Sequence, residues 1–449
     1  MIRKREPGQE PPPPGSILSR LRVGILLNII GGAFAQGSTL ALNLVTANLL
    51  GRLAFGEFTV VQATLSTVGA LAQVATGYTA TKYVAEFRDQ DPERAARILC
   101  LCRRLSNGTA LVAALSLLLT APWIASSAYD APQLTPWLRT AAPGVLFIVM
   151  NGFRSGALAG LESYQPLARV GVISGMVYIT LGVLGAYTAG VQGALVGVVL
   201  SAGVQWLLLG VTLTRELARR GIPARVAHPW RERSTLVHFA LPAALTGAIT
   251  LPAFWLASAC LVRQPGGLEQ MALFGAANSF RLVVLFLPNI MNSVGMSLLN
   301  NQRATSQDGY RRIFWWNLAL TAASVSIGAA AVIAVGPPLL RAFGKGFDAG
   351  FTVLRLLMLA AVLESVAIWT YQVIQSHGRM WLTLGLVTVP RDCLILALAY
   401  SWTPAHGAAG LAAAHVGGWT LALLAIGLLT YRLGLTTARP DFAWQTGRG

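Results

Sequence analysis

Long stretches without a charged side chain dominate this chain. The longest, residues 170–214, contains no Asp, Glu, Lys or Arg in forty-five positions. A helix rises about 1.5 Å per residue, and about 20 apolar residues cross the hydrocarbon core of a bilayer. The run is therefore too long for one membrane span and is expected to hold two. The turn between them is predicted at Gly190-Val191-Gln192-Gly193.

Composition agrees with a membrane protein. Of the 449 residues, 54% are hydrophobic and 11% are charged, whereas a soluble domain has about 25% charged residues. Segments of helical length between charges predict an all-α integral membrane protein with twelve transmembrane helices. Besides the two within 170–214, the expected spans are 23–51, 58–81, 105–124, 137–159, 236–262, 271–297, 313–336, 353–375, 380–401 and 408–431.

Basic residues fall mostly on one side of these spans. With both termini placed in the cytoplasm, 26 of the 34 Lys and Arg residues lie on the cytoplasmic side, 6 lie outside, and Arg281 and Arg391 lie within spans. Positive charge is typical of cytoplasmic loops, so the split predicts a multi-pass plasma-membrane protein with both ends inside. Membrane topology and anionic lipid explain the net charge of +17 better than a nucleic-acid partner does.

The two halves of the chain share a pattern. Tyr129-Asp130 matches Phe347-Asp348 and Gly160 matches Gly378 at an offset of 218, and Gly190-x-x-Gly193 matches Gly407-x-x-Gly410 at 217. Parallel repeats with a site between two lobes are a transporter architecture. The predicted domains are a basic, Pro-rich tail expected to be disordered (1–22), an N-lobe (23–214), a basic cytoplasmic linker (215–233), a C-lobe (234–431) and a second cytoplasmic tail (432–449).

Motifs for catalysis or metal binding are missing from the sequence. It contains no G-x-x-x-x-G-K-[ST], no G-x-S-x-G and no HExxH, so neither an ATP-driven motor nor a common hydrolase is indicated. The four cysteines form no CxxC pair and no metal-binding spacing. We therefore expect no enzymatic activity, no cofactor and no metal site.

Three stretches resemble the oligosaccharide-lipid (O-antigen type) flippases of the multidrug/oligosaccharidyl-lipid/polysaccharide exporter superfamily. They are LLGRLAFGEFTVVQATLS through TGYTATKYVAEFR, then FGAANSFRLVVLFLPNIMNSVG, and then the pair SGALAGLESYQ and VIQSHGRM. The resemblance implies a V-shaped, MATE-like bundle of two six-helix lobes. It also implies transfer of an undecaprenyl-diphosphate-linked oligosaccharide from the inner to the outer leaflet. This lipid-linked oligosaccharide is the expected partner, together with membrane lipids and the polymerase and glycosyltransferases of a surface-polysaccharide (O-antigen or exopolysaccharide) pathway.

Polar side chains form stripes within several predicted spans. At 100° per residue, Asn278, Arg281, Asn289 and Asn292 fall on one helix face. Polar groups in hydrocarbon need partners or water, so the stripes either join helices or line a wet cavity that meets sugar hydroxyls. The candidate substrate-binding residues from these stripes are Asn278, Arg281, Asn289 and Asn292, with Gln62 and Gln73 from the second span and Asn43 from the first.

Charged residues inside spans are the other candidates. Arg281 is expected to bind the lipid diphosphate, because a guanidinium binds phosphate through two aligned donors. The alternative is that Arg281 pairs with Glu364 or Asp392 and holds the lobe together. Arg154 either contacts substrate or extends to the inner headgroups. Glu364 and Arg391 form either a structural ion pair or a site that couples transport to a cation.

A cation-coupled multidrug exporter of the same superfamily is the alternative function. Such exporters typically carry an acidic residue in their first helix. The present chain has none between Arg22 and Glu57, which favours the flippase.

Overall fold

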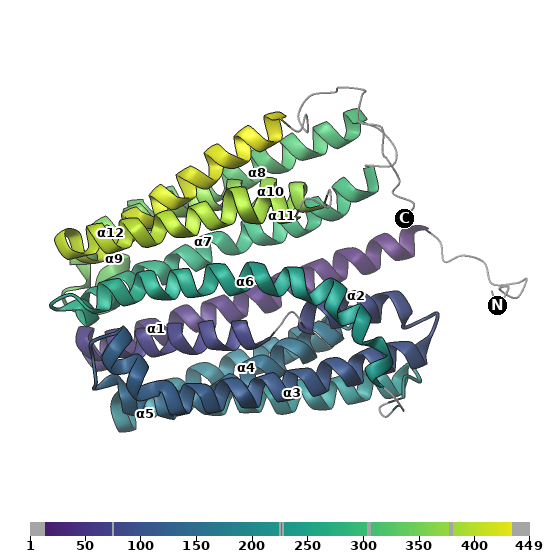
Figure 1. Ribbon diagram of the computed structural model, residues 1–449, viewed down its shortest axis with the longest axis horizontal. Coiled ribbons are helices and arrows are strands. Elements are labelled where there is room, and N and C mark those ends of the chain that lie inside the picture. Colours follow the sequence, from purple (N-terminus) through teal and green to yellow (C-terminus); the bar gives the residue numbers. More distant parts are fainter. Residues whose placement is uncertain are drawn as a thin grey trace, which may run out of the picture.

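The computed structural model describes residues 14–73, 76–223, 226, 229–302, 307–376 and 380–432. Within these ranges, every regular element is a helix (Figure 1). The helices are α1 (Pro14–Ala72), α2 (Thr76–Phe87), α3 (Pro92–Trp123), η1 (Ile124–Ala128), α4 (Leu134–Gly160), α5 (Tyr164–Arg219), η2 (Pro229–Glu232), α6 (Arg233–Val262), α7 (Gly267–Gln302), α8 (Gln307–Ala334), α9 (Gly336–Arg341), η3 (Phe347–Gly350), α10 (Phe351–Ser376), α11 (Met380–Thr383), η4 (Leu384–Thr388) and α12 (Val389–Arg432).

Eight of the described helices are long and apolar enough to cross a membrane. Three of these eight contain a break in the helical backbone, at Gly51 in α1, at Ala189–Gly190 in α5 and at Gly407 in α12. All three glycines have positive φ, of 78°, 60° and 54°, a conformation that residues with a Cβ rarely adopt. The break in α5 confirms the turn predicted inside the long charge-free run. The count of twelve spans and the cytoplasmic position of the termini stay predictions.

Two helix boundaries differ from those expected. Helix α1 begins at Pro14, so residues 14–22 of the expected disordered tail are helical; proline favours the first turn of a helix because its φ is already helical. The predicted continuous span 58–81 is interrupted, since α1 ends at Ala72 and α2 begins at Thr76. Residues 1–13 and 433–449 of the predicted tails, four residues of the linker, and Gly378 lie outside the described ranges.

The helices pack in two groups that meet along α1, α6 and α7. Helices α3, α4 and α5 lie along one side of the bundle and α8, α10 and α12 along the other (Figure 1). In the first group, α4 contacts α1, α2, α3 and α5; in the second, α10 contacts α7, α8 and α12, and α12 contacts α6. The groups meet where α1 packs on α7 and α6. The bounds of the N-lobe and the C-lobe stay predictions.

Aromatic rings close the contact between the groups near the break in α1. Phe55 of α1 packs edge-on against Phe343 and Phe347, with centroids 6.1 and 5.9 Å away. All three rings are buried. A Cβ at Gly56 would overlap the carbonyl oxygen of Leu268, so the α1 and α7 segments touch at backbone distance. We call these five residues the aromatic seam.

Candidate functional site

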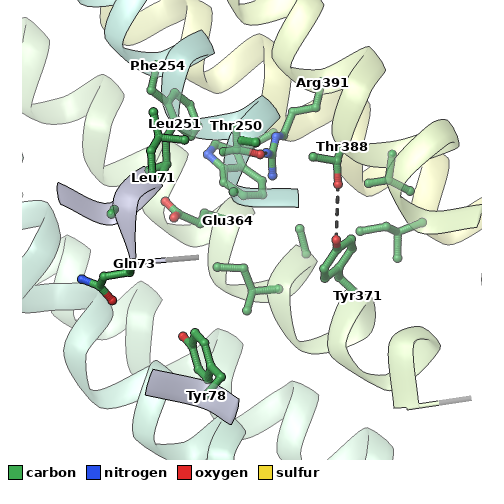
Figure 2. Close-up of a pocket in the computed structure, with 18 residues that line it drawn as sticks. Leu71, Gln73, Tyr78, Thr250, Leu251, Phe254, Glu364, Tyr371, Thr388 and Arg391 are labelled. Atoms are coloured by element: carbon green, nitrogen blue, oxygen red, sulfur yellow. Dashed lines mark hydrogen bonds between the residues drawn. The ribbon is translucent and has the colours of Figure 1, made fainter. Parts of the chain in front are cut away.

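A cavity of about 530 Å³ lies between the two helix groups. Its walls come from the end of α1 and the start of α2 on one side, and from α6, α10, η4 and α12 on the other (Figure 2). The wall is largely apolar but carries hydroxyl, amide and charged groups. The polar and charged lining residues are Gln73, Tyr78, Thr250, Glu364, Tyr371, Thr388 and Arg391.

Departures from regular helix occur next to this cavity. The interruption between α1 and α2 places Gln73 at its wall, where the Thr76 hydroxyl donates to the Gln73 carbonyl at 2.8 Å. The π-helical turn η4 supplies Val387 and Thr388. Irregular backbone at membrane depth is tolerated where it lines a cavity, and π-turns are frequent at functional sites.

The two charged residues expected to pair with each other have different partners. Glu364 of α10 forms its ion pair with Arg281 of α7, and both side chains are largely buried, at 13% and 12% exposure. Arg281 also donates to Asn278 Oδ1 at 3.0 Å. The expected Glu364–Arg391 pair is therefore wrong, and the reason is local: Arg391 has a nearer carboxylate in Asp392.

Arg391 lies in a second ion pair at the cavity wall. Its guanidinium contacts Asp392 Oδ1 at 2.7 Å and donates to the Thr250 hydroxyl at 3.2 Å. Thr250 in turn donates to Asp392 Oδ2 at 2.8 Å. The guanidinium carbon lies 4.4 Å from the centre of the Trp419 ring. The ion pairs Arg281–Glu364 and Arg391–Asp392 thus place two positive and two negative charges beside the cavity.

Several residues that form this site were not candidates from the sequence. Thr250 and Trp419 hold Arg391, and neither belongs to a polar stripe. His415 is buried and stacks on Phe254 at 5.1 Å between ring centres. The Tyr371 hydroxyl accepts from the Thr388 hydroxyl at 3.4 Å (Figure 2). Tyr371 follows Glu364 by seven residues on the same helix face, and this spacing was the signal in the sequence.

The polar stripe of α7 divides between different surroundings. Asn278 and Arg281 join the Glu364 pair, whereas Asn292 is 1% exposed and its Oδ1 accepts from Asn317 and Thr321 of α8. Asn289 is exposed. A role for Asn289 and Asn292 in binding stays a prediction, and the contacts of Asn292 are those of a helix–helix bond.

The candidates of the first helix group lie at three places. Gln73 lines the central cavity. Gln62 lines a second cavity of about 260 Å³ inside the group and donates to the Tyr178 hydroxyl at 3.2 Å. Asn43 donates to Ser279 at 3.0 Å and so bonds α1 to α7. Arg154 donates to the Trp206 carbonyl, away from both cavities.

Known proteins are similar to this chain in sequence. A family model described as polysaccharide biosynthesis protein matches residues 90–251. The EPS I polysaccharide export inner membrane protein EpsE of Ralstonia nicotianae is 24% identical over 397 residues, covering 87% of this chain and 88% of that protein. EpsE of Ralstonia solanacearum is 23% identical over 367 residues, covering 80% and 82%.

Solved structures share the fold. An inward-facing multidrug resistance MATE family transporter of the MOP superfamily has a TM-score of 0.72 at 18% identity, covering 95% of this chain and 99% of that one. The lipid II flippase MurJ, in an inward closed conformation, has a TM-score of 0.68 at 13% identity, covering 92% and 90%. The MATE-like fold that the resemblance implied is therefore confirmed, with eight described helices long and apolar enough to cross a membrane, and the chain is similar in sequence to polysaccharide export proteins.

Proposed function

We propose that the protein is a flippase for an undecaprenyl-diphosphate-linked oligosaccharide, which it moves from the inner to the outer leaflet for surface polysaccharide synthesis. The observation that carries the proposal is the central cavity, whose lining combines hydroxyl and amide groups with Arg391. Hydroxyls and amides suit sugar hydroxyls, and a guanidinium suits a diphosphate. The printed names of the similar proteins, polysaccharide export for two and lipid II flippase for another, support the same substrate class.

Arg391 is the proposed diphosphate contact within this cavity. Its ring contact with Trp419 and its bonds to Asp392 and Thr250 fix the guanidinium at the wall. When a diphosphate arrives, its oxygens take the place of those of Asp392 and Thr250 as acceptors for the Arg391 guanidinium. The guanidinium therefore has an anionic partner both before and after the substrate binds. Burying an unpaired phosphate in hydrocarbon would be very costly, and this exchange lowers that cost.

Arg281 becomes a second phosphate contact only when Glu364 releases it. Uptake of a proton by Glu364 removes the negative charge of the carboxylate and weakens its hold on the Arg281 guanidinium. The freed cation then attracts the diphosphate toward Asn278 and the cavity. In this scheme Glu364 is the coupling residue, and the ion pair of the empty protein is the resting state.

The aromatic seam and the cavity lie at different heights of the bundle. The seam lies at the α1 break, whereas the cavity lies at the other end of the second half of α1, near Gln73. Closure at the seam leaves the cavity on the side of α2 and the basic segment 82–104. The described conformation therefore fits loading from the inner leaflet, and transport requires the seam to open.

The protein is proposed to act without catalysing a reaction, as a transporter serving polymerase and glycosyltransferases of its pathway.

The alternative, a cation-coupled multidrug exporter, is favoured by the MATE transporters among the similar structures. A deletion strain separates the two. The flippase predicts accumulation of lipid-linked oligosaccharide, loss of surface polysaccharide and unchanged drug susceptibility. Increased drug susceptibility with normal surface polysaccharide would overturn the proposal.

A further inference from the structure

A half-buried cation of the first helix group has no carboxylate partner. Arg154 of α4 makes no ion pair with any described residue. Its guanidinium carbon lies 4.4 Å from the centre of the Trp206 ring of α5, and it donates to the Trp206 carbonyl. A Cβ at Gly210 would lie 2.6 Å from Arg154 Nη1, so the glycine leaves the space that the guanidinium occupies. The head group is thus held in place rather than extended freely toward water.

A second unpaired cation adds to this charge. Arg103 of α3 is exposed and follows Cys102, which shares a buried cluster with Phe153, the residue before Arg154. The positive charge of Arg103 acts on Arg154. Arg103 also forms no ion pair among the described residues. Like charges held together favour binding of an anion that both can contact. Three helices, α3, α4 and α5, therefore converge on one positive site.

Arg154 lies close to the boundary between the hydrocarbon core and the lipid phosphates. Helix α4 has 27 residues, which makes it about 40 Å long against a hydrocarbon core of about 30 Å. Arg154 lies six residues before the end of α4 at Gly160, or about 9 Å from that end. The end belongs to the side where the basic segments lie. Leu207 and Val211, on the same part of α5, are at least half exposed, which indicates a lipid-facing surface beside the site.

We propose that Arg154 and Arg103 form a binding site for the phosphate group of a lipid in the inner leaflet, outside the central cavity. Two guanidinium groups supply paired donors for phosphate oxygens, and Trp206 and Gly210 position one of them. The phosphate belongs either to a membrane phospholipid or to the diphosphate lipid carrier. The second source rests on the proposed flippase function and makes the site a place where substrate waits before it reaches the cavity.

Binding to purified full-length protein in nanodiscs tests the site. The probes are undecaprenyl diphosphate without sugar, phosphatidylglycerol, and diacylglycerol as a lipid without phosphate, each measured by native mass spectrometry. Arg103→Gln and Arg154→Gln should each weaken binding of a phosphate-bearing lipid about tenfold, as expected for one charged contact. Arg104→Gln, the adjacent exposed arginine with no place in the site, should change affinity less than twofold. Diacylglycerol retention should be the same in all four proteins.

Background variants separate this site from the central cavity. In an Arg391→Gln protein, the effects of Arg103→Gln and Arg154→Gln should persist. Loss of both lipids supports a general phosphate site, and loss of undecaprenyl diphosphate alone supports a substrate site. Unchanged binding of both phosphate-bearing lipids in Arg103→Gln and in Arg154→Gln, each folded and as abundant as the parent protein, would overturn the proposal. If Arg391→Gln has no effect while these arginine variants do, the phosphate site stands and the proposed cavity contact fails.

Discussion

The Arg281 guanidinium and the Glu364 carboxylate form an ion pair that joins α7 to α10. Glu364 also lines the central cavity, whereas Arg281 lies behind it and donates to Asn278. Arg281 Nε is buried without a partner. The cation is therefore held mainly by one carboxylate, and any change in the charge of that carboxylate changes the electrostatics of the cavity wall.

Removing the arginine should destabilise the protein. Arg281→Ala leaves Glu364 as a largely buried charge without its cation, and breaking such a pair costs about 3–5 kcal/mol. We expect lower abundance in the membrane fraction and a lower melting temperature in detergent. Arg281→Gln/Glu364→Gln, which removes both charges, should recover most of the loss. Equal stability of the single and double variants would show that the pair does not hold α7 to α10.

Glu364→Gln tests whether Glu364 couples transport to protons. Glu364→Gln keeps an oxygen that accepts from Arg281 but cannot take up a proton. We expect some loss of abundance, because Arg281 is then a largely buried cation without its anion. In the protein that remains, transport should no longer respond to a pH gradient, measured as lipid-linked oligosaccharide translocation in vesicles. Glu269→Gln, an exposed acid that pairs with Arg52, is the matched control and should respond normally. A gradient response retained in Glu364→Gln would exclude this carboxylate as the coupling residue.

The sequence predicted the helix breaks better than the side-chain partners. Gly190 was identified because a charge-free run was too long for one span, and that argument depends only on length. The repeat paired it with Gly407, which also proved to be a break. Glycine with positive φ is a local property, so sequence can reveal it.

Partners were harder to predict because helix α7 meets different neighbours along its length. A helical wheel places Arg281 and Asn292 on one face, but Arg281 bonds to α10 and Asn292 accepts from α8. Periodicity gives a direction around the helix axis and says nothing of which helix lies there. The same limit explains the Glu364–Arg391 error, because a helical wheel does not show that Arg281 of α7 lies beside Glu364 and that Arg391 pairs with Asp392.

Arg391 should be needed for substrate rather than for folding alone. Arg391→Lys keeps the charge near Asp392 but loses the planar contact with Trp419 and the two-donor geometry for phosphate. We expect normal abundance with transport reduced about tenfold, the loss of roughly one charged contact. The transport is measured by the amount of surface polysaccharide that the variant restores in a deletion strain. Arg355→Lys, an arginine near a ring outside the cavity, is the control, and equal loss in both would argue against a specific role.

Gly56 should control the opening of the aromatic seam. An alanine Cβ at this position would overlap the Leu268 carbonyl oxygen, and such overpacking costs about 1–3 kcal/mol in the closed state. A state in which α1 and α7 separate does not bear this cost, so Gly56→Ala should shift the population toward it by about fivefold or more. In a Cys-free background with Thr59→Cys, which faces Gly275 across the same contact, a membrane-impermeant maleimide added outside should react correspondingly faster.

The control for this experiment is Gly37→Ala in the same helix. A Cβ at Gly37 has no atom within 4 Å, so the substitution changes helix propensity without crowding a neighbour. Its labelling rate should match that of the parent protein. Faster labelling in both variants would point to a general loosening of α1, and an unchanged rate in Gly56→Ala would mean that α7 can shift while the seam stays closed. A faster rate confined to Gly56→Ala would link the close approach of Gly56 and Leu268 to the closed state, because the alanine at Gly37 crowds no neighbouring atom.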